Sequence, residues 1–277
     1  MTSMHGGFVF VLAGGRTMRC TARGRLRHRR EGLLAGDRVV VGVSGSAVVE
    51  SVLPRKTELT RPPVANAELA VLVQAAAEPP PSPALLDRML IQARAAGLAV
   101  LILWNKADLA REAALELCHS YRSAGFTGWL TSTVTGEGVP ELKEALSGRI
   151  SVLAGPSGAG KSSLLNAVTG APALKTQPVS AHSGRGRHTT RLTELLPLAG
   201  GGLVADTPGF TSLQLPALKK AELRRFYPEF QPWQPECFFR GCLHDQEPVC
   251  AVKAALNAGK LDPGRYDRYR MFLAELE

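Results

Sequence analysis

Residues 155–162 run Gly-Pro-Ser-Gly-Ala-Gly-Lys-Ser and match the phosphate-binding pattern G-x-x-x-x-G-K-[ST]. Its glycines let backbone N–H groups converge on phosphate oxygens, and a helix beginning here adds its partial positive charge. Lys161 is expected to reach the outer phosphates, and the Ser162 hydroxyl to bind Mg²⁺. A chance Gly-rich turn is the alternative. The predicted phosphate-binding residues are Gly155, Pro156, Ser157, Gly158, Ala159, Gly160, Lys161, Ser162 and Ser163.

Residues 105–108 run Asn-Lys-Ala-Asp and match N-K-x-D, the pattern by which GTPases recognise guanine. A buried Asp108 carboxylate can accept from the ring N–H and the exocyclic amine of guanine, whereas adenine offers neither donor there. Alone, four such residues usually mark a surface turn, but together with a phosphate loop they predict a GTP site. Ser132 and Thr133 are weaker candidates for contacts to the guanine carbonyl, with a Thr-rich strand end as the alternative. The predicted guanine-binding residues are Asn105, Lys106, Ala107, Asp108, Ser132 and Thr133.

A strand-like run ends at residues 206–209, Asp-Thr-Pro-Gly, which match D-x-P-G. Asp206 is expected to hold Mg²⁺ through water, and the Gly209 N–H to contact the γ-phosphate. An acidic β-turn is the alternative interpretation.

The basic, Gly-rich segment 184–191 contains a histidine followed by two threonines. Thr190, in preference to Thr189, is a candidate to complete the Mg²⁺ shell, and a solvated basic linker is the alternative. Many GTPases orient the attacking water with a Gln just after D-x-x-G, but here that position is Phe210. We therefore expect His188 to position the water, although it could instead contact RNA or solvent. The predicted catalytic residues are Lys161, His188 and Thr190.

Three of the five cysteines and one of the six histidines lie within residues 237–250. Three thiolates and one imidazole form a closed tetrahedral zinc set, which predicts a structural and not a catalytic metal. Disulfides are the alternative, but three cysteines cannot all pair. The predicted zinc ligands are Cys237, Cys242, His244 and Cys250.

The formal charge of +9 is concentrated near the N-terminus, where residues 1–61 hold eleven Lys/Arg and four Asp/Glu, a net charge of +7. The densest run includes Arg25, Arg27 and Arg29 and suits a nucleic-acid backbone, with a solvated loop as the alternative. No apolar stretch reaches the length of a membrane span, and residues 8–12 lack the basic leader of a signal peptide. We expect a cytoplasmic protein.

The elements that must position these residues follow from hydrophobic periodicity. Apolar runs at 98–104, 150–154 and 203–206 predict buried strands that end at the motifs, and 162–168 predicts a helix that stops at Gly170. The first sixty residues contain short strand-like runs at 8–12, 17–21 and 38–43, which suit a small OB-type barrel. The sequence thus predicts a multidomain protein with an N-terminal OB-type β-barrel at 1–62, a central α/β P-loop GTPase domain at 63–214 and an α-helical zinc-binding domain at 215–277.

The guanine motif precedes the phosphate loop by about fifty residues, the reverse of the order in ordinary GTPases. This order is typical of circularly permuted GTPases, and the chain resembles the ribosome small-subunit-dependent GTPase A (RsgA) family. The resemblance covers essentially the whole chain. It rests on the motif order, on Leu-Pro-Arg-Lys-Thr at 53–57, Arg-Pro at 61–62, Leu-Asp-Arg at 86–88 and Arg-His-Thr-Thr at 187–190, and on the zinc set.

The resemblance implies a GTPase that binds the small ribosomal subunit late in maturation and is stimulated by it. It also points to His188 in catalysis. The implied partners are the small subunit with its rRNA and GTP or GDP; we expect a monomer and no membrane partner. One alternative is a nucleic-acid-binding module in which GTP only locks the shape. Another is an ATP-dependent phosphotransferase or transport ATPase, which Asn105 and Asp108 argue against.

Overall fold

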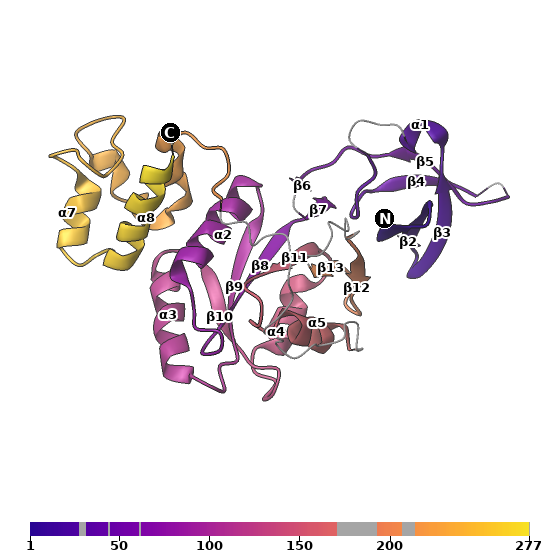
Figure 1. The fold of residues 1–277 in the computed structure, drawn as a ribbon, viewed down its shortest axis with the longest axis horizontal. Coiled ribbons are helices and arrows are strands. Elements are labelled where there is room, and N and C mark those ends of the chain that lie inside the picture. Colours follow the sequence, from indigo (N-terminus) through magenta and orange to yellow (C-terminus); the bar gives the residue numbers. More distant parts are fainter. Residues whose placement is uncertain (28–31, 44, 61, 171–192, 207–213, 277) are drawn as a thin grey trace, which may run out of the picture.

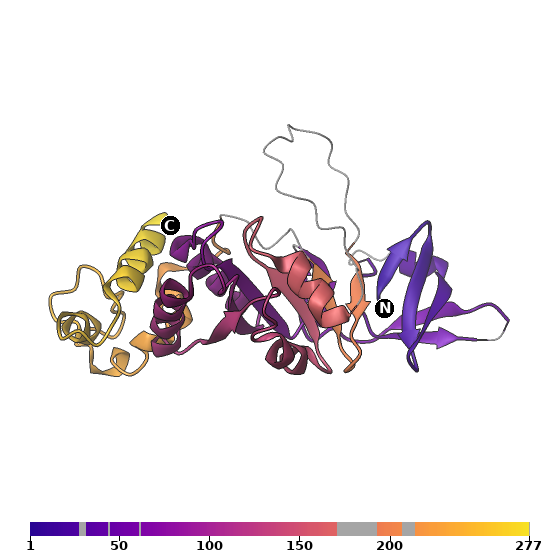
Figure 2. The same ribbon diagram turned by 90° about the horizontal axis from the view of Figure 1, so that it is seen from below.

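The computed structural model describes residues 1–27, 32–43, 45–60, 62–170, 193–206 and 214–276, with only the backbone of Arg25, Arg27 and Asp206. An N-terminal sheet, a central sheet flanked by helices and a helical C-terminal part lie in a row in both views (Figures 1 and 2). Among the described residues, no helix is both long and apolar enough to cross a membrane.

The N-terminal part is a five-stranded sheet in the order β1-β2-β3-β5-β4. All its ladders are antiparallel except β3 with β5, where Thr21 pairs with Val48. Its core contains Val9, Val11 and Val49. The three predicted strands are confirmed as β2, β3 and β4. The element bounds are β1 Ser3–His5, β2 Phe8–Ala13, β3 Arg16–Ala22, α1 Gly24–Arg27, β4 Val39–Gly42 and β5 Val48–Val52.

A short hairpin of β6 (Glu58–Thr60) and β7 (Pro63–Ala65) leads from this sheet to the central one. Arg55 holds it to the N-terminal part, because its Nε lies 2.7 Å from Asp37 Oδ1 and its Nη1 lies 2.8 Å from Glu58 Oε2. The Asp37 side chain is fully buried.

The central sheet has the strand order β10-β9-β8-β11-β13-β12, and only β12 runs antiparallel to its neighbour. Alternate side chains of β8 face opposite sides, so Ala70 and Leu72 pack toward α2 and α3 while Val71 and Val73 pack toward α4 and α5. The bounds are β8 Leu69–Ala75, α2 Pro83–Ala95, β9 Ala99–Asn105, α3 Arg111–Ser123, β10 Thr127–Thr131, α4 Val139–Leu146, β11 Ile150–Ala154, α5 Lys161–Thr169, β12 Leu195–Pro197 and β13 Leu203–Asp206.

The C-terminal part is built from short helices around an aromatic core that includes Tyr227, Phe230 and Tyr269. The Phe230 and Tyr269 rings meet edge to face at 5.0 Å. Ile91 of α2 joins this core, so the C-terminal part packs directly on the central one. Its elements are α6 Lys220–Leu223, three short 3₁₀ helices at Arg224–Phe226, Pro228–Phe230 and Gln234–Glu236, α7 Ala251–Asn257 and α8 Pro263–Glu275.

Candidate nucleotide and metal sites

The predicted motifs follow neighbouring parallel strands and therefore meet at one edge of the central sheet. The phosphate loop, residues 155–162, follows β11, and the guanine motif, residues 105–108, follows β9, with β8 between them. Ligands of open α/β sheets bind at this edge, outside the carboxyl ends of the strands. The strands predicted at 98–104 and 150–154 and the helix predicted at 162–168 are confirmed as β9, β11 and α5.

At two positions of the phosphate loop, neighbouring atoms leave no room for a side chain, so glycine is required. A Cβ on Gly155 would lie 2.1 Å from the carbonyl oxygen of Val73. Gly160 has a φ of +89°, and a Cβ there would lie 2.2 Å from Asn105 Nδ2. Near the end of the loop, Lys161 Nζ lies 2.9 Å from the carbonyl oxygens of both Gly155 and Pro156, so its ammonium group folds back over the start of the loop.

Asn105, the last residue of β9, is bonded both to the end of β10 and to the phosphate loop. Its Nδ2 donates to the carbonyl oxygen of Ala159 at 2.8 Å, and its Oδ1 accepts from Thr131 Oγ1 at 3.1 Å. Asn105 is 1% exposed, so both bonds are shielded from water. Thr131 immediately precedes the candidate Ser132 but is not among the predicted guanine-binding residues.

Ser132 orients the carboxylate that is predicted to recognise guanine. Ser132 Oγ donates to Asp108 Oδ1 at 2.5 Å and accepts from the N–H groups of Val134 and Thr135, both at 3.2 Å. Thr133 is exposed and takes no part in this arrangement. Asp108 itself is exposed, because it lies in a surface turn three residues beyond the end of β9.

Lys106 is held between two loops. Its φ of +60° places it in the left-handed region, which is uncommon for a side-chain-bearing residue. Its Cε lies 3.9 Å from the position that a Cβ on Gly160 would occupy, and its Nζ donates to the carbonyl oxygen of Glu78. Glu78 lies in the loop between β8 and α2.

The remaining nucleotide-site predictions fall mostly outside the described residues. The backbone of Asp206 ends β13 and pairs with Leu153 of β11, so it lies at the same sheet edge as the phosphate loop. The Asp206 side chain lies outside the described part of the chain, as do His188, Thr189, Thr190, Gly209 and Phe210.

The four predicted metal ligands come together as a compact cluster whose donor atoms all lie within 4.8 Å of one another. His244 Nδ1 lies 3.6 Å from Cys237 Sγ and 3.4 Å from Cys250 Sγ, and these two sulfurs are 4.0 Å apart. A tetrahedral zinc with bonds of about 2.3 Å to sulfur and about 2.0 Å to nitrogen separates its ligand atoms by about 3.5–3.8 Å. The cluster therefore fits a tetrahedral metal ion.

The protonation states of the cluster make metal binding depend on the loss of thiol protons. Burial, with the charge of Arg224 as a second cause, lowers the pKa of His244 to about 4, so the imidazole is neutral and able to ligate at neutral pH. Burial raises the pKa of Cys242 to about 12, so this thiol keeps its proton unless a cation replaces it. Binding of a divalent metal would therefore release protons from the thiols.

Neighbouring side chains hold the ligand-bearing loop in place. Tyr266 Oη donates to the carbonyl oxygen of His244 at 2.7 Å, and Tyr269 Oη donates to that of Leu243 at 2.6 Å. Arg224 Nη1 donates to the carbonyl oxygen of Cys242 at 2.6 Å. The loop geometry is thus fixed by α8 and by the short helix that contains Arg224, and not by the four ligands alone.

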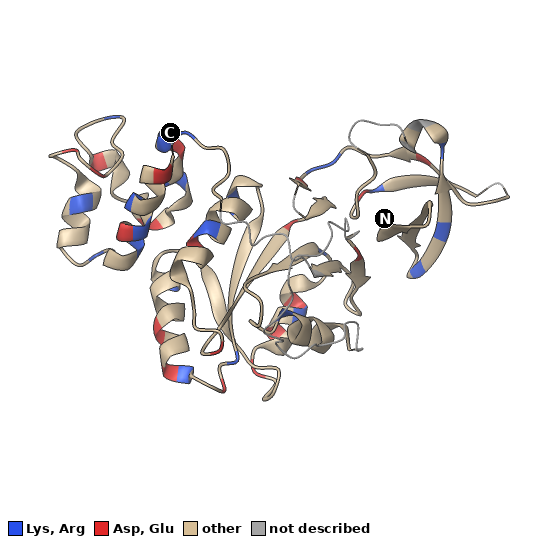
Figure 3. Ribbon diagram, in the orientation of Figure 1, with Lys and Arg blue, Asp and Glu red and all other residues tan. Residues whose placement is uncertain are grey.

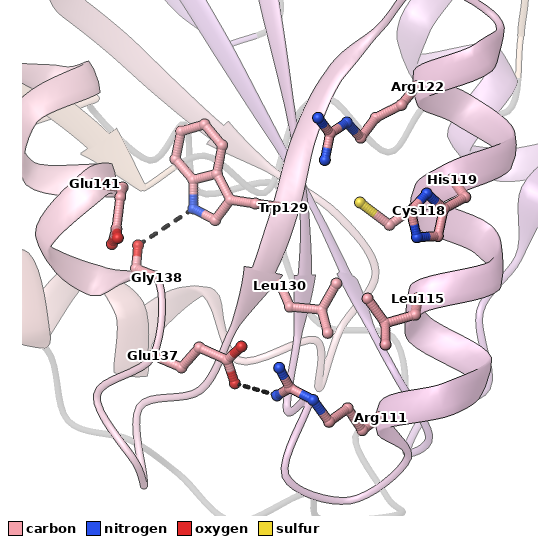
Figure 4. Close-up of a pocket in the computed structure, with 10 residues that line it drawn as sticks. All are labelled: Arg111, Leu115, Cys118, His119, Arg122, Trp129, Leu130, Glu137, Gly138 and Glu141. Carbon is pink, nitrogen blue, oxygen red and sulfur yellow. Dashed lines mark hydrogen bonds and ion pairs between the residues drawn. The ribbon is translucent and has the colours of Figure 1, made fainter.

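A separate cavity of about 400 Å³ lies over the edge strand β10, between α3 and α4 (Figure 4). Arg111 and Glu137 close one end with an ion pair of 2.7 Å, and Leu115 and Leu130 lie between the two helices. None of its ten lining residues belongs to the phosphate loop or the guanine motif, so it is distinct from the predicted nucleotide site.

Comparison with known proteins gives consistent matches along the chain. A family model described as RsgA GTPase matches residues 52–216, and one described as RsgA N-terminal domain matches residues 1–47. Proteins named small ribosomal subunit biogenesis GTPase RsgA from Moorella thermoacetica and Geobacillus thermodenitrificans are each 46% identical, over 98% of this chain and 94% of the relative.

Two solved structures share the fold over nearly the whole chain. The crystal structure of YjeQ from Thermotoga maritima is 37% identical with a TM-score of 0.85, covering 99% of this chain and 96% of that one. YloQ, described as a circularly permuted GTPase, is 32% identical with a TM-score of 0.82, covering 99% and 93%. Together with the motif order and the Asn105–Ala159 hydrogen bond, these matches establish that the chain belongs to the RsgA family of circularly permuted GTPases.

Proposed function

We propose that this protein is a GTP hydrolase that binds the small ribosomal subunit, is stimulated by it and assists its late maturation. The observation that carries the proposal is the hydrogen bond between Asn105 and Ala159, which unites the guanine motif with the phosphate loop in a chain of permuted order. The names of the relatives supply the biological setting, since they are called small ribosomal subunit biogenesis GTPases.

The nucleotide is held by residues from both halves of the site. The backbone of the phosphate loop and Lys161 bind the phosphates, and Asp108 accepts hydrogen bonds from guanine with its orientation fixed by Ser132. The proposed GTP-binding residues are Asn105, Lys106, Ala107, Asp108, Ser132, Thr133, residues 155–163, Asp206 and Gly209.

Mg²⁺ accompanies GTP in this family, and the hydroxyl of Ser162 is suited to bind it at the first turn of α5. Thr190 and Asp206 complete the proposed set, and His188 is proposed to orient the attacking water. When bound, the metal neutralises charge that develops on the phosphates. Lys161 shares this electrostatic role. The backbone N–H groups of the phosphate loop are proposed to donate hydrogen bonds to the phosphate oxygens.

The Cys₃His cluster is proposed to hold one structural zinc ion. The interatomic distances fit a tetrahedral site, and four protein ligands leave no coordination position for a substrate. Such an ion would stabilise the fold of the C-terminal part, because metal binding supplies folding free energy. Cys237, Cys242, His244 and Cys250 are its proposed ligands.

We propose three domains, an OB-type barrel at 1–62, a permuted GTPase domain at 63–214 and a helical zinc-binding domain at 215–277. The strand order β1-β2-β3-β5-β4 with a parallel β3–β5 pair supports the first assignment. The net charge of +7 over residues 1–61 supports contact between this domain and ribosomal RNA. We further propose that the protein acts as a monomer in the cytoplasm, without a membrane partner.

The decisive experiment is GTP turnover measured with increasing amounts of small subunits, large subunits or protein-free RNA. We expect slow turnover alone and strong stimulation by small subunits only, with inhibition by unlabelled GDP but not ADP. Equal turnover with and without small subunits would instead support a binding module in which GTP only locks the shape. If ATP competes with GTP for the site, the proposed recognition of guanine is contradicted.

A further inference from the structure

The C-terminal part is joined to the central sheet by a buried ionic cluster, which we call the Asp87 cluster: Asp87, Tyr121, Glu229, Arg265 and Arg268. Asp87 Oδ1 accepts from Tyr121 Oη at 2.7 Å and from Arg265 Nη1 at 2.6 Å, and its Oδ2 accepts from Arg268 Nε at 2.5 Å. Asp87 is 1% exposed, and 178 positions separate it from Arg265. A carboxylate on α2 is therefore bound by two arginines of α8.

Arg265 is itself fully enclosed. Its Nε donates to Glu229 Oε1 at 2.5 Å, and its guanidinium carbon lies 5.1 Å from the Tyr121 ring centre and 4.9 Å from that of Tyr227. The cluster contains two acidic and two basic side chains, so its charges balance. Acidic and basic positions occur on both α2 and α8 (Figure 3). Such a buried network is specific in geometry, because each member needs its partners in place.

The same helix α2 begins beside the guanine motif. Ser82 caps α2, with its Oγ accepting from the Leu85 N–H at 3.4 Å. The loop before it contains Glu78, whose carbonyl oxygen accepts a hydrogen bond from Lys106 Nζ. The loop is also tied directly to the motif, because the Ala76 N–H donates to the carbonyl oxygen of Asn105 at 2.7 Å. Nine positions of chain thus separate Asp87 from a carbonyl group that binds a guanine-motif side chain.

Apolar packing alone does not fix where α2 lies along its own axis. Leu86, Met89 and Leu90 pack it against the sheet, but hydrophobic contacts are non-directional and tolerate small shifts. The bonds to Asp87 are directional, and Tyr121 Oη in addition lies 3.3 Å from the carbonyl oxygen of Pro83, the first residue of α2. Docking of the C-terminal part therefore sets the position of the helix that follows Glu78.

We propose that Asp87 is a positioning residue for guanine-nucleotide binding. By fixing α2 it fixes the Glu78 carbonyl group, which holds Lys106 against the phosphate loop. The C-terminal part and the guanine-binding half of the site then behave as one unit. Loosening the cluster frees Lys106 and speeds nucleotide release. This inference rests on the guanine-binding role proposed above for residues 105–108.

The test uses the full chain and two variants that each remove a hydrogen bond to Asp87, Tyr121→Phe and Arg268→Gln. Release of fluorescent GDP is followed after mixing with excess unlabelled GDP. We expect release about fivefold faster in each variant, the size of coupling common within one hydrogen-bonded network. Arg88→Gln is the matched control. Arg88 is the next residue of α2 and also reaches α8, through Glu275 and over the Phe272 ring at 4.6 Å, but it does not bond Asp87. We expect its release rate to equal wild type.

A double-mutant cycle with Lys106→Met tests whether the Asp87 cluster affects nucleotide release through Lys106. If Asp87 acts through Lys106, adding Tyr121→Phe to Lys106→Met leaves the release rate unchanged, whereas independent effects would multiply. Three results would each overturn the inference. The release rate could be unaltered in both Tyr121→Phe and Arg268→Gln, the effects of Tyr121→Phe and Lys106→Met on it could multiply, or Arg88→Gln could raise it equally. Asp108→Asn separates it from the proposed function: if that change leaves GDP binding intact, the guanine site itself is misassigned. Circular dichroism and metal content check that each variant is folded.

Discussion

Asn105 Nδ2 donates to the carbonyl oxygen of Ala159 at 2.8 Å, although 54 positions separate the two residues in the chain. In this way the proposed guanine motif helps to set the shape of the proposed phosphate loop. The contact leaves no room at the next residue, since a Cβ on Gly160 would lie 2.2 Å from the same Nδ2.

Gly160→Ala should therefore damage nucleotide binding. The new methyl group displaces Asn105, and a φ of +89° adds backbone strain of about 1–2 kcal/mol. We expect GTP affinity to fall at least about tenfold, equivalent to about 1.4 kcal/mol, by equilibrium titration. Gly97→Ala is the control, because Gly97 has a φ of +77° but no heavy atom near its Cβ position. If both variants bind GTP like wild type, the Asn105–Ala159 contact does not shape the loop.

Asp108→Asn should change which base the site accepts. The carboxylate that accepts from guanine becomes an amide, leaving a mispaired donor that costs about 1–3 kcal/mol or more. We expect weaker GTP binding and stronger binding of xanthosine triphosphate, which has a carbonyl group in place of the guanine amine. Titration with both nucleotides measures this exchange. Unchanged GTP affinity would show that Asp108 does not contact the base.

Cys242→Ser should remove the metal and loosen the C-terminal part. Metal analysis of the wild-type chain should give one zinc per protein, and the variant should give much less. Because metal binding supplies folding free energy, we expect unfolding of this part to become easier by several kcal/mol, about the loss seen for structural sites. Cys118→Ser is the control, since Cys118 is buried in the central core, away from the cluster. Zinc-free folded protein, or a Cys237–Cys250 disulfide, would contradict the assignment.

Changing Arg25, Arg27 and Arg29 together to Glu should weaken binding to small subunits and flatten its salt dependence. Each lost phosphate contact lowers the slope of log K against log salt by about 0.7–0.9. GTP turnover without ribosomes should not change. The control is a second triple variant in which three exposed residues outside the N-terminal part are changed to Glu, so that the net charge changes equally. These residues are Lys143, Arg225 and Lys260. Equal affinity and slope in both triple variants would identify the arginine run as a solvated segment.

His188→Ala should retain GTP affinity and subunit binding but lose most of the stimulated turnover, about a 10²–10⁴-fold effect for a group that acts on the attacking water. Single-turnover hydrolysis at saturating small subunits measures it. His119→Ala, on α3 and beside the separate cavity, is the control. If the stimulated turnover of His188→Ala equals that of wild type, another group, such as ribosomal RNA, positions the attacking water.

The sequence by itself determined the chemistry of the sites. The four proposed metal ligands lie within fourteen positions, so local chain geometry is enough to bring them together. The phosphate loop and the guanine motif are far apart, but each follows a buried strand. Because parallel strands end at one edge of a sheet, their meeting could be predicted from pattern alone. The exposure of the Asp108 side chain could not be predicted in this way, since residue type does not reveal whether a turn residue is covered.

Only the tertiary structure decided how these parts are held. Asp87 and Arg265 are charged residues on amphipathic helices, and such residues are usually solvated. They are buried because α8 packs on α2, although 178 positions separate the two residues in the sequence. No local sequence pattern encodes such a contact. The contact of Lys106 with Glu78 and that of Thr131 with Asn105 have the same origin. Short-range sequence fixes which donors and acceptors exist, whereas the packing of all the elements fixes which of them meet.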